Sequence, residues 1–192
     1  MKIRTGFVSN SSSSSFTCEV SGNTESGWDL CLRDCDMMEC INGHTYHTEY
    51  MVKELKDSDR PFVKEVLTGD YDYGVPQEMI NRIDDINDKE ILNELLEFDY
   101  PEGNYEVPEF LCPICMFKVI SNTDLIQYLK KHSGMSWADA FAIIKEENKR
   151  RRKLYDYEYV ELASKFMGTT KEELTEEIIS KYETIEKFYE SL

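Results

Sequence analysis

Residues 110–121 read Phe-Leu-Cys-Pro-Ile-Cys-Met-Phe-Lys-Val-Ile-Ser, and the two cysteines in this segment constrain the rest of the chain. Cys112 and Cys115 are separated by two residues, and Pro113 stiffens the turn between them. A turn of this kind offers two thiolates to one tetrahedral zinc ion. Because a structural zinc ion takes four ligands, the motif predicts a second ligand pair elsewhere in the sequence.

The second pair is expected in the other cysteine-rich segment, residues 18–47. Asn42-Gly43 is a strong signal for a tight turn, so Cys40 and His44 are expected on either side of a hairpin bend, facing one point. Since four residues fill the shell, no position is left for water, and the zinc ion is expected to be structural. The predicted zinc ligands are Cys40, His44, Cys112 and Cys115.

Two other arrangements stay open at this point. Cys18 is an alternative to His44, which would make the shell all-cysteine, and His47 is a further candidate for one of the four places. Cys31 and Cys35 fall outside the pattern and are interpreted as small buried residues.

The order and spacing of the candidates resemble the cross-braced zinc arrangement of RING-like and treble-clef domains. In that arrangement, the first and third ligand pairs bind one ion, and the second and fourth pairs bind another. The resemblance implies a complete second site, formed by the four residues named above. It implies a degenerate first site, in which Cys18 and His47 remain while Ser21 and Tyr50 stand where ligands would be.

Cys112 and Cys115 could instead be core thiols or a redox pair. A thioredoxin-like pair needs a strand before it and a helix that starts at its second cysteine. Here residues 116–120 are predicted to form a strand, and the next helix is predicted to begin only after Ser121, which favours zinc.

The chain is strongly acidic. Its 192 residues include 38 acidic and 22 basic residues, so the formal net charge is -16. Such a surface repels phosphate backbones and anionic lipid, which makes direct binding to nucleic acid or membranes unfavourable, and it attracts a strongly basic protein. The alternative is that the acidity only maintains solubility.

We expect a cytoplasmic protein, because no segment has the length of a membrane span and the first residues lack a signal-peptide core. In that compartment, six cysteines favour thiolates or metal ligands over disulfides.

The expected fold is mainly α, of the α+β class, with a small zinc-stapled hairpin and knuckle module packed against a helical bundle. Helices are predicted over 45–56, 61–67, 76–98 as one or two, 122–131, 136–153, 155–167 and from 170 onward. The expected organisation is a Ser-rich N-terminal segment at 1–16, a zinc-binding module with inserted acidic helices at 17–121, and a C-terminal helical region at 122–192.

Residues 6–16 read Gly-Phe-Val-Ser-Asn, five serines and Phe. This opening resembles the start shared by many small proteins of phages and prophages of Gram-positive bacteria. The resemblance implies an origin and a place of action, the cytosol of the bacterial host, but no chemistry.

Motifs for catalysis are missing from the sequence: it has no phosphate-cradling glycine loop and no His-Glu-x-x-His signature, and His132 lacks a nucleophile at motif spacing. We therefore expect a non-enzymatic protein that binds and inhibits a basic, nucleic-acid-handling host protein, such as a CRISPR effector nuclease. An open zinc shell would instead indicate a metal-dependent hydrolase.

The main alternative is a nucleic-acid-associated regulatory zinc protein. It would use residues 149–153, Lys-Arg-Arg-Arg-Lys, the one basic block in the sequence. The simpler interpretation of this run is a solvated helix face that balances nearby acidic residues. An apolar stripe on the last helix is a further candidate surface, and it consists of Leu174, Ile178, Tyr182, Ile185 and Tyr189.

Overall fold

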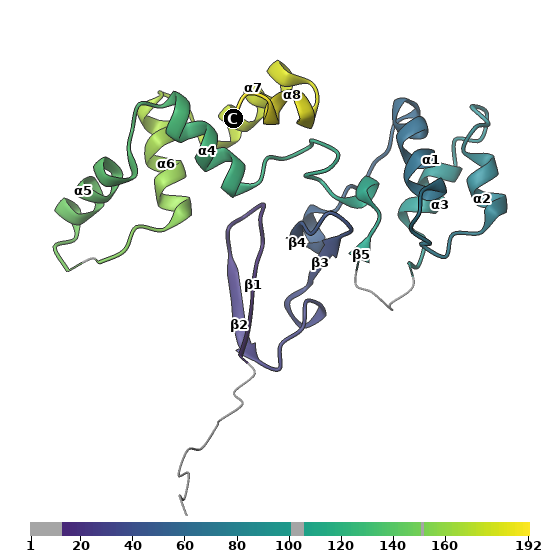
Figure 1. The fold of residues 1–192 in the computed structure, drawn as a ribbon, viewed down its shortest axis with the longest axis horizontal. Coiled ribbons are helices and arrows are strands. Elements are labelled where there is room, and N and C mark those ends of the chain that lie inside the picture. Colours follow the sequence, from purple (N-terminus) through teal and green to yellow (C-terminus); the bar gives the residue numbers. More distant parts are fainter. Residues whose placement is uncertain (1–12, 101–105, 151) are drawn as a thin grey trace, which may run out of the picture.

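The computed structural model describes residues 13–100, 106–150 and 152–192. A central β region lies between two helical lobes, one formed by α1–α3 and the other by α4–α8 (Figure 1). The expected α+β class is therefore confirmed. Most of the phage-like opening, residues 1–12, lies outside the described residues.

The first part of the β region is a hairpin. Strand β1 (Ser13–Thr17) pairs antiparallel with β2 (Thr24–Trp28), from Ser13 opposite Trp28 to Thr17 opposite Thr24. The end of the serine run is thus part of a strand and not of a separate segment ending at residue 16. Backbone pairing with β2 explains this, because strand hydrogen bonds do not depend on large side chains.

The second part is a three-stranded sheet of order β4-β3-β5. β3 (Met37–Cys40) pairs antiparallel with β4 (Thr45–His47) and parallel with β5 (Glu106–Val107). The turn between β3 and β4 contains Gly43 at φ +78°, which explains the Asn-Gly sequence found there.

The predicted helix over residues 45–56 is wrong. Its first three residues form β4, and Thr48–Tyr50 form a short 3₁₀ turn. Tyr46 has no exposed surface and lies opposite Met38 of β3. Strand pairing together with burial of this ring outweighs the helical spacing of the apolar residues.

The segment between β4 and β5 forms a helical lobe with its own core. The lobe contains α1 (Arg60–Thr68), α2 (Gln77–Arg82) and α3 (Ile91–Leu96). α1 begins with Pro61 in its first turn, as predicted, and residues 76–98 form two short helices. The most deeply buried residues of this core are Val63, Ile83, Ile91, Leu95 and Phe110.

Arg60 holds this lobe together. Its side chain is 7% exposed, and its guanidinium donates to Asp57 at 2.8 Å and to the carbonyl oxygens of Ile83, Asp85 and Asp88 at 2.9, 3.3 and 2.8 Å. The carbonyl oxygens belong to the loop between α2 and α3, so one cation fixes that loop against α1.

Arg60→Lys is expected to lower the free energy of unfolding of this lobe by about 2 kcal/mol, because one ammonium group cannot reproduce the planar fork of donors. Urea unfolding followed by circular dichroism measures the change. Lys64→Arg, one turn along α1, is the matched control and should change stability little. Equal stability of Arg60→Lys and the wild type would contradict this role.

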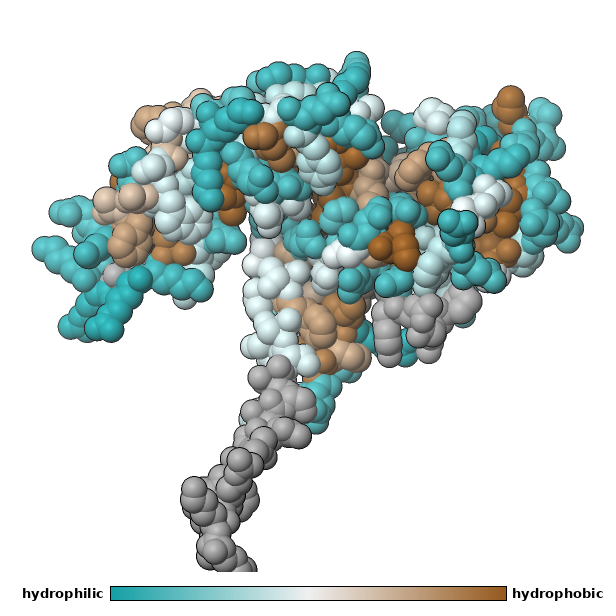
Figure 2. Space-filling model, viewed as in Figure 1, coloured by the Kyte–Doolittle hydropathy of each residue, from teal (hydrophilic) through white to brown (hydrophobic). Residues whose placement is uncertain are grey.

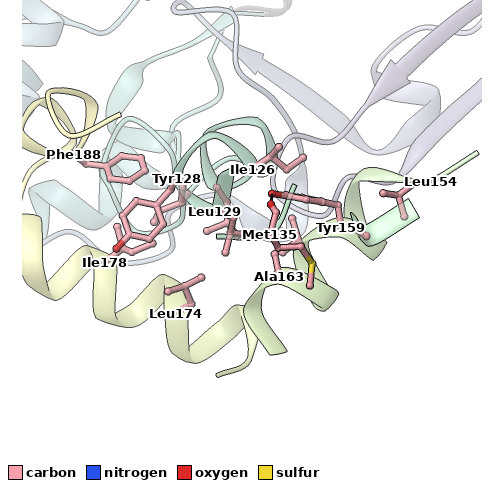
Figure 3. Packing of buried hydrophobic residues seen from close by; sticks show 14 of the residues in the cluster. Ile126, Tyr128, Leu129, Met135, Leu154, Tyr159, Ala163, Leu174, Ile178 and Phe188 are labelled. Atoms are coloured by element: carbon pink, nitrogen blue, oxygen red, sulfur yellow. Dashed lines mark hydrogen bonds between the residues drawn. The ribbon is translucent and has the colours of Figure 1, made fainter. Parts of the chain in front are cut away.

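The C-terminal lobe consists of α4 (Asn122–His132), α5 (Trp137–Glu147), α6 (Asp156–Phe166), α7 (Lys171–Tyr182) and α8 (Ile185–Tyr189). Figure 3 shows Leu129 of α4 and Ala163 of α6 in one cluster of buried side chains, which also includes Phe188 of α8. The predicted capping boxes at Ser136 with Asp139 and Thr170 with Glu173 are both formed.

Two helix ends differ from the prediction in this lobe. The helix expected over 136–153 ends at Glu147, before the basic run, since like charges three and four residues apart repel one another on a helix. The last helix is interrupted at Glu183, which has φ +63°, so the apolar stripe is divided between α7 and α8. Leu174 and Ile178 of this stripe are buried, whereas Tyr189 is largely exposed.

Candidate metal centre

A cluster of three thiols and one imidazole lies where the β3–β4 hairpin meets the turn that follows β5. Cys40 ends β3, and His44 immediately precedes β4. The parallel pairing of β3 with β5 places Cys40 opposite Val107, and the Ile41 amide donates to the Val107 carbonyl at 3.2 Å. The chain that leaves β5 therefore delivers Cys112 and Cys115 beside the hairpin.

The four donor atoms converge on one point. Nδ1 of His44 lies 3.5 Å from Sγ of Cys40, 3.7 Å from Sγ of Cys112 and 3.3 Å from Sγ of Cys115. Sγ of Cys40 and Sγ of Cys115 are 3.8 Å apart, and all four atoms lie within 4.8 Å of one another. Four donors at such distances can fill the coordination sphere of a tetrahedral metal ion.

The turn that carries the two later cysteines is held by hydrogen bonds to sulfur. The Cys115 amide donates to Sγ of Cys112 at 3.5 Å, and the Asn42 side chain donates to Sγ of Cys115 at 3.4 Å. Bonds of this kind stabilise negative charge on sulfur, the form in which cysteine binds a metal.

The predicted strand over residues 116–120 is wrong. Phe117 has φ +49°, and the amides of Lys118 and Val119 both donate to the carbonyl oxygen of Pro113, so the segment folds back on the turn. The next helix, α4, begins only at Asn122, as predicted. The cysteine pair therefore lacks the helix that a thioredoxin-like site places at its second cysteine.

Electrostatics within the cluster favour a positive charge at its centre. Hydrogen bonds to Cys115 and Cys40 raise the pKa of His44 to about 10. Hydrogen bonding to Cys115 and Cys40, together with burial, also raises the pKa of the Cys112 thiol. The sulfur atoms thus stabilise a cation among them, whether it is a proton or a metal ion.

Cys18 and His47, the open alternatives from the sequence, lie outside this cluster. The turn at Cys18 nevertheless repeats the hydrogen bonding of the turn at Cys112. The Ser21 amide donates to Sγ of Cys18 at 3.4 Å, and the Gly22 amide donates to the Cys18 carbonyl at 2.7 Å. The corresponding bond in the later turn joins Met116 to the Cys112 carbonyl at 3.0 Å.

The remaining residues of the degenerate site lie beside this first turn. Tyr50 lies in the short 3₁₀ turn that follows β4, and the ring of His47 lies 6.4 Å from that of Tyr50. Nδ1 of His47 is buried and has no hydrogen-bond partner among the described residues. Cys18 and Ser21 therefore share one turn, and His47 lies beside Tyr50.

The other two cysteines have separate surroundings. The Cys31 thiol and amide both donate to the carboxylate of Asp34, at 2.9 and 3.0 Å, and Cys35 is buried. All six cysteines are free in this structure.

No family model, curated protein or solved structure matches this chain. Within residues 13–100, 106–150 and 152–192, no helix is both long enough and apolar enough to span a membrane.

The less buried side of the cluster opens into a cavity of about 370 Å³ that sequence reasoning missed. Both helical lobes contribute to its walls, because Phe62 comes from α1 and Ile185 and Tyr189 come from α8. The apolar stripe predicted on the last helix includes Ile185 and Tyr189, but no sequence motif marks Phe62 or indicates that α1 and α8 meet at this cavity. The cavity is lined by Asn42, His44, Phe62, Glu109, Cys115, Ile185, Glu186 and Tyr189.

Proposed function

We propose that the cluster binds one structural zinc ion. With Zn–S bonds of about 2.3 Å and Zn–N bonds of about 2.05 Å, a tetrahedral ion needs S–S separations of about 3.8 Å and S–N separations of about 3.6 Å. The Cys40–Cys115 separation of 3.8 Å and the three S–N separations of 3.3–3.7 Å agree with these values. The proposed ligands are Cys40, His44, Cys112 and Cys115.

The protein we infer is non-enzymatic and acts by binding another protein. Four protein ligands leave a tetrahedral zinc ion without a vacant position for water or substrate, so the ion would hold the fold and would not activate a nucleophile. The metal site joins Cys40 to Cys115, which are 75 residues apart in the sequence, and so anchors the segment between them.

The segment between Cys40 and Cys115 has an acidic surface on its α1–α3 lobe. The proposed binding function rests on this surface. Asp70, Glu78, Glu90 and Glu97 are exposed, and none of them forms an ion pair with another described residue. Figure 2 shows largely hydrophilic residues on the outer side of the α1–α3 lobe. Unpaired carboxylates on a rigid lobe can attract a basic partner and orient it.

The partner we propose is a basic, nucleic-acid-handling host protein, with a CRISPR effector nuclease as the most specific case. Such effectors hold nucleic acid in a positively charged channel, which an acidic protein can occupy in its place. The net charge of -16 supports this choice of partner, and the resemblance of residues 6–16 to phage proteins supports the choice of host.

The test is binding to a purified CRISPR effector nuclease at low and high salt, together with its DNA cleavage. Affinity should fall at least about tenfold as salt rises, because screening weakens contacts between exposed charges. Asp70→Asn, Glu78→Gln, Glu90→Gln and Glu97→Gln combined should weaken binding and restore cleavage. The matched control neutralises four exposed carboxylates of the other lobe, Glu172, Glu176, Glu177 and Glu190, and should bind as the wild type.

Salt-insensitive binding would contradict the acidic surface and would instead favour the apolar residues of α7 and α8. Equal binding by the α1–α3 variant and the wild type would overturn the proposed surface. Failure to bind any such effector would overturn the choice of partner.

A further inference from the structure

The basic block lies in the loop between α5 and α6, whereas the sequence predicted that it would lie on a helix. α5 ends at Glu147 and α6 begins at Asp156, so the run lies on a connection at the end of the C-terminal lobe and not on a helix face (Figure 1). Asn148 has φ -132° and ψ 90°, which places the following chain in an extended direction.

The described cations of this loop are exposed and form no ion pair with another described residue. These cations are Lys149, Arg150, Arg152 and Lys153. The interpretation of the run as a helix face that balances nearby acids is therefore wrong. Its positive charge remains available to a ligand.

Two tyrosines adjoin these cations. Tyr155 and Tyr157 are 44% and 52% exposed, and their rings lie 6.0 Å apart at an interplanar angle of 16°. Nζ of Lys153 lies 5.0 Å from the centre of the Tyr155 ring. The tyrosines are held in place, since Leu154 between them and the cations is buried and the Tyr155 amide donates to Glu158 at 3.0 Å.

We propose that this basic–tyrosine loop binds single-stranded nucleic acid. Lysine and arginine contact the phosphates, and exposed aromatic rings stack on unpaired bases, a combination that needs no particular base sequence. A duplex is a poorer ligand because its bases are already stacked. The acidity of the rest of the chain confines the contact to the loop, so the site should cover only a few nucleotides. The proposed contacts are Lys149, Arg150, Arg152, Lys153 and Tyr155 of the loop, together with Tyr157 in the first turn of α6.

The experiment uses the full-length protein and fluorescence anisotropy of a labelled oligothymidine, a duplex of equal length, and inorganic polyphosphate as competitor. The wild type should bind the single strand with an affinity that falls as salt rises. Arg150→Gln, Arg152→Gln and Lys153→Gln combined should weaken binding at least about tenfold. The control triple variant is Lys53→Gln, Lys89→Gln and Lys118→Gln, which removes equal charge from exposed lysines elsewhere and should bind as the wild type.

Tyr155→Ala with Tyr157→Ala separates stacking from charge. It should weaken binding to the single strand about tenfold, while circular dichroism stays unchanged. Unchanged binding by this variant, equal affinity for the duplex, or no binding to the single strand would each overturn the proposal. The proposed acidic surface lies in the α1–α3 lobe, so the variants that neutralise it should bind the single strand as the wild type does. The two proposals are therefore tested independently.

Discussion

Cys112→Ser is expected to abolish stoichiometric zinc binding and to unfold the central β region. Cys112 has no exposed surface and lies in the same buried cluster as Tyr46. A serine hydroxyl is a poor zinc ligand, and metal binding at a structural site supplies about 10 kcal/mol or more. That is comparable with the whole stability of an ordinary domain, so the region should not stay folded without the ion.

Elemental analysis of the purified variant and hydrogen exchange of the β3 and β4 amides measure the two effects. Cys31→Ser is the matched control, because its hydroxyl can still donate to Asp34, and it should retain one zinc ion per chain. A chelator should reproduce the effect of Cys112→Ser in the wild type. Full zinc content in Cys112→Ser, or unchanged protection of these amides without metal, would contradict the proposed role of the site.

Leu129→Ala is expected to destabilise the C-terminal lobe by about 3 kcal/mol while zinc stays bound. Leu129 has no exposed surface and lies in the cluster between α4 and α6, so shortening it leaves a cavity in addition to the lost burial. Among the described residues, the cluster of this lobe and the one beside the metal site share only Ile185. The loss of stability caused by Leu129→Ala should therefore be largely confined to the C-terminal lobe.

Thermal unfolding followed by circular dichroism, with zinc content measured in parallel, tests this prediction. Gln127→Ala, at an exposed position on the same helix, is the control and should change stability little. Loss of zinc together with the lobe would show that the lobes and the metal site unfold as one cooperative unit.

The cluster at the candidate site could be predicted from sequence because its signals are local. Two cysteines separated by two residues define one pair, and the Asn-Gly turn brings Cys40 and His44 together whatever the rest of the chain does. The starts of helices with strong caps, such as α5 and α7, were predicted for the same reason. Each of these features depends on fewer than about ten consecutive residues.

The predictions that were wrong concern residues whose structure depends on contacts with distant segments of the chain. Residues 45–47 have helical periodicity but pair with β3, and β5 is a two-residue strand that only its pairing with β3 defines. Residues 116–120 have the composition of a strand but find no neighbouring strand, and they fold back on Pro113. The cavity walls from α1 and α8 could not be predicted at all, because neither helix carries a signal for the other.

The chain leaves the central β region for the α1–α3 lobe and returns from the lobe at almost the same point. The amide of Val52, just before the lobe, donates to the carbonyl oxygen of Leu111, just after it, at 3.0 Å. An insertion whose ends meet in this way can be exchanged or shortened without moving the surroundings of its ends. The central region is therefore suited to carry a different inserted segment at this position, and new binding specificities could be grafted there while the cluster of Cys40, His44, Cys112 and Cys115 stays intact.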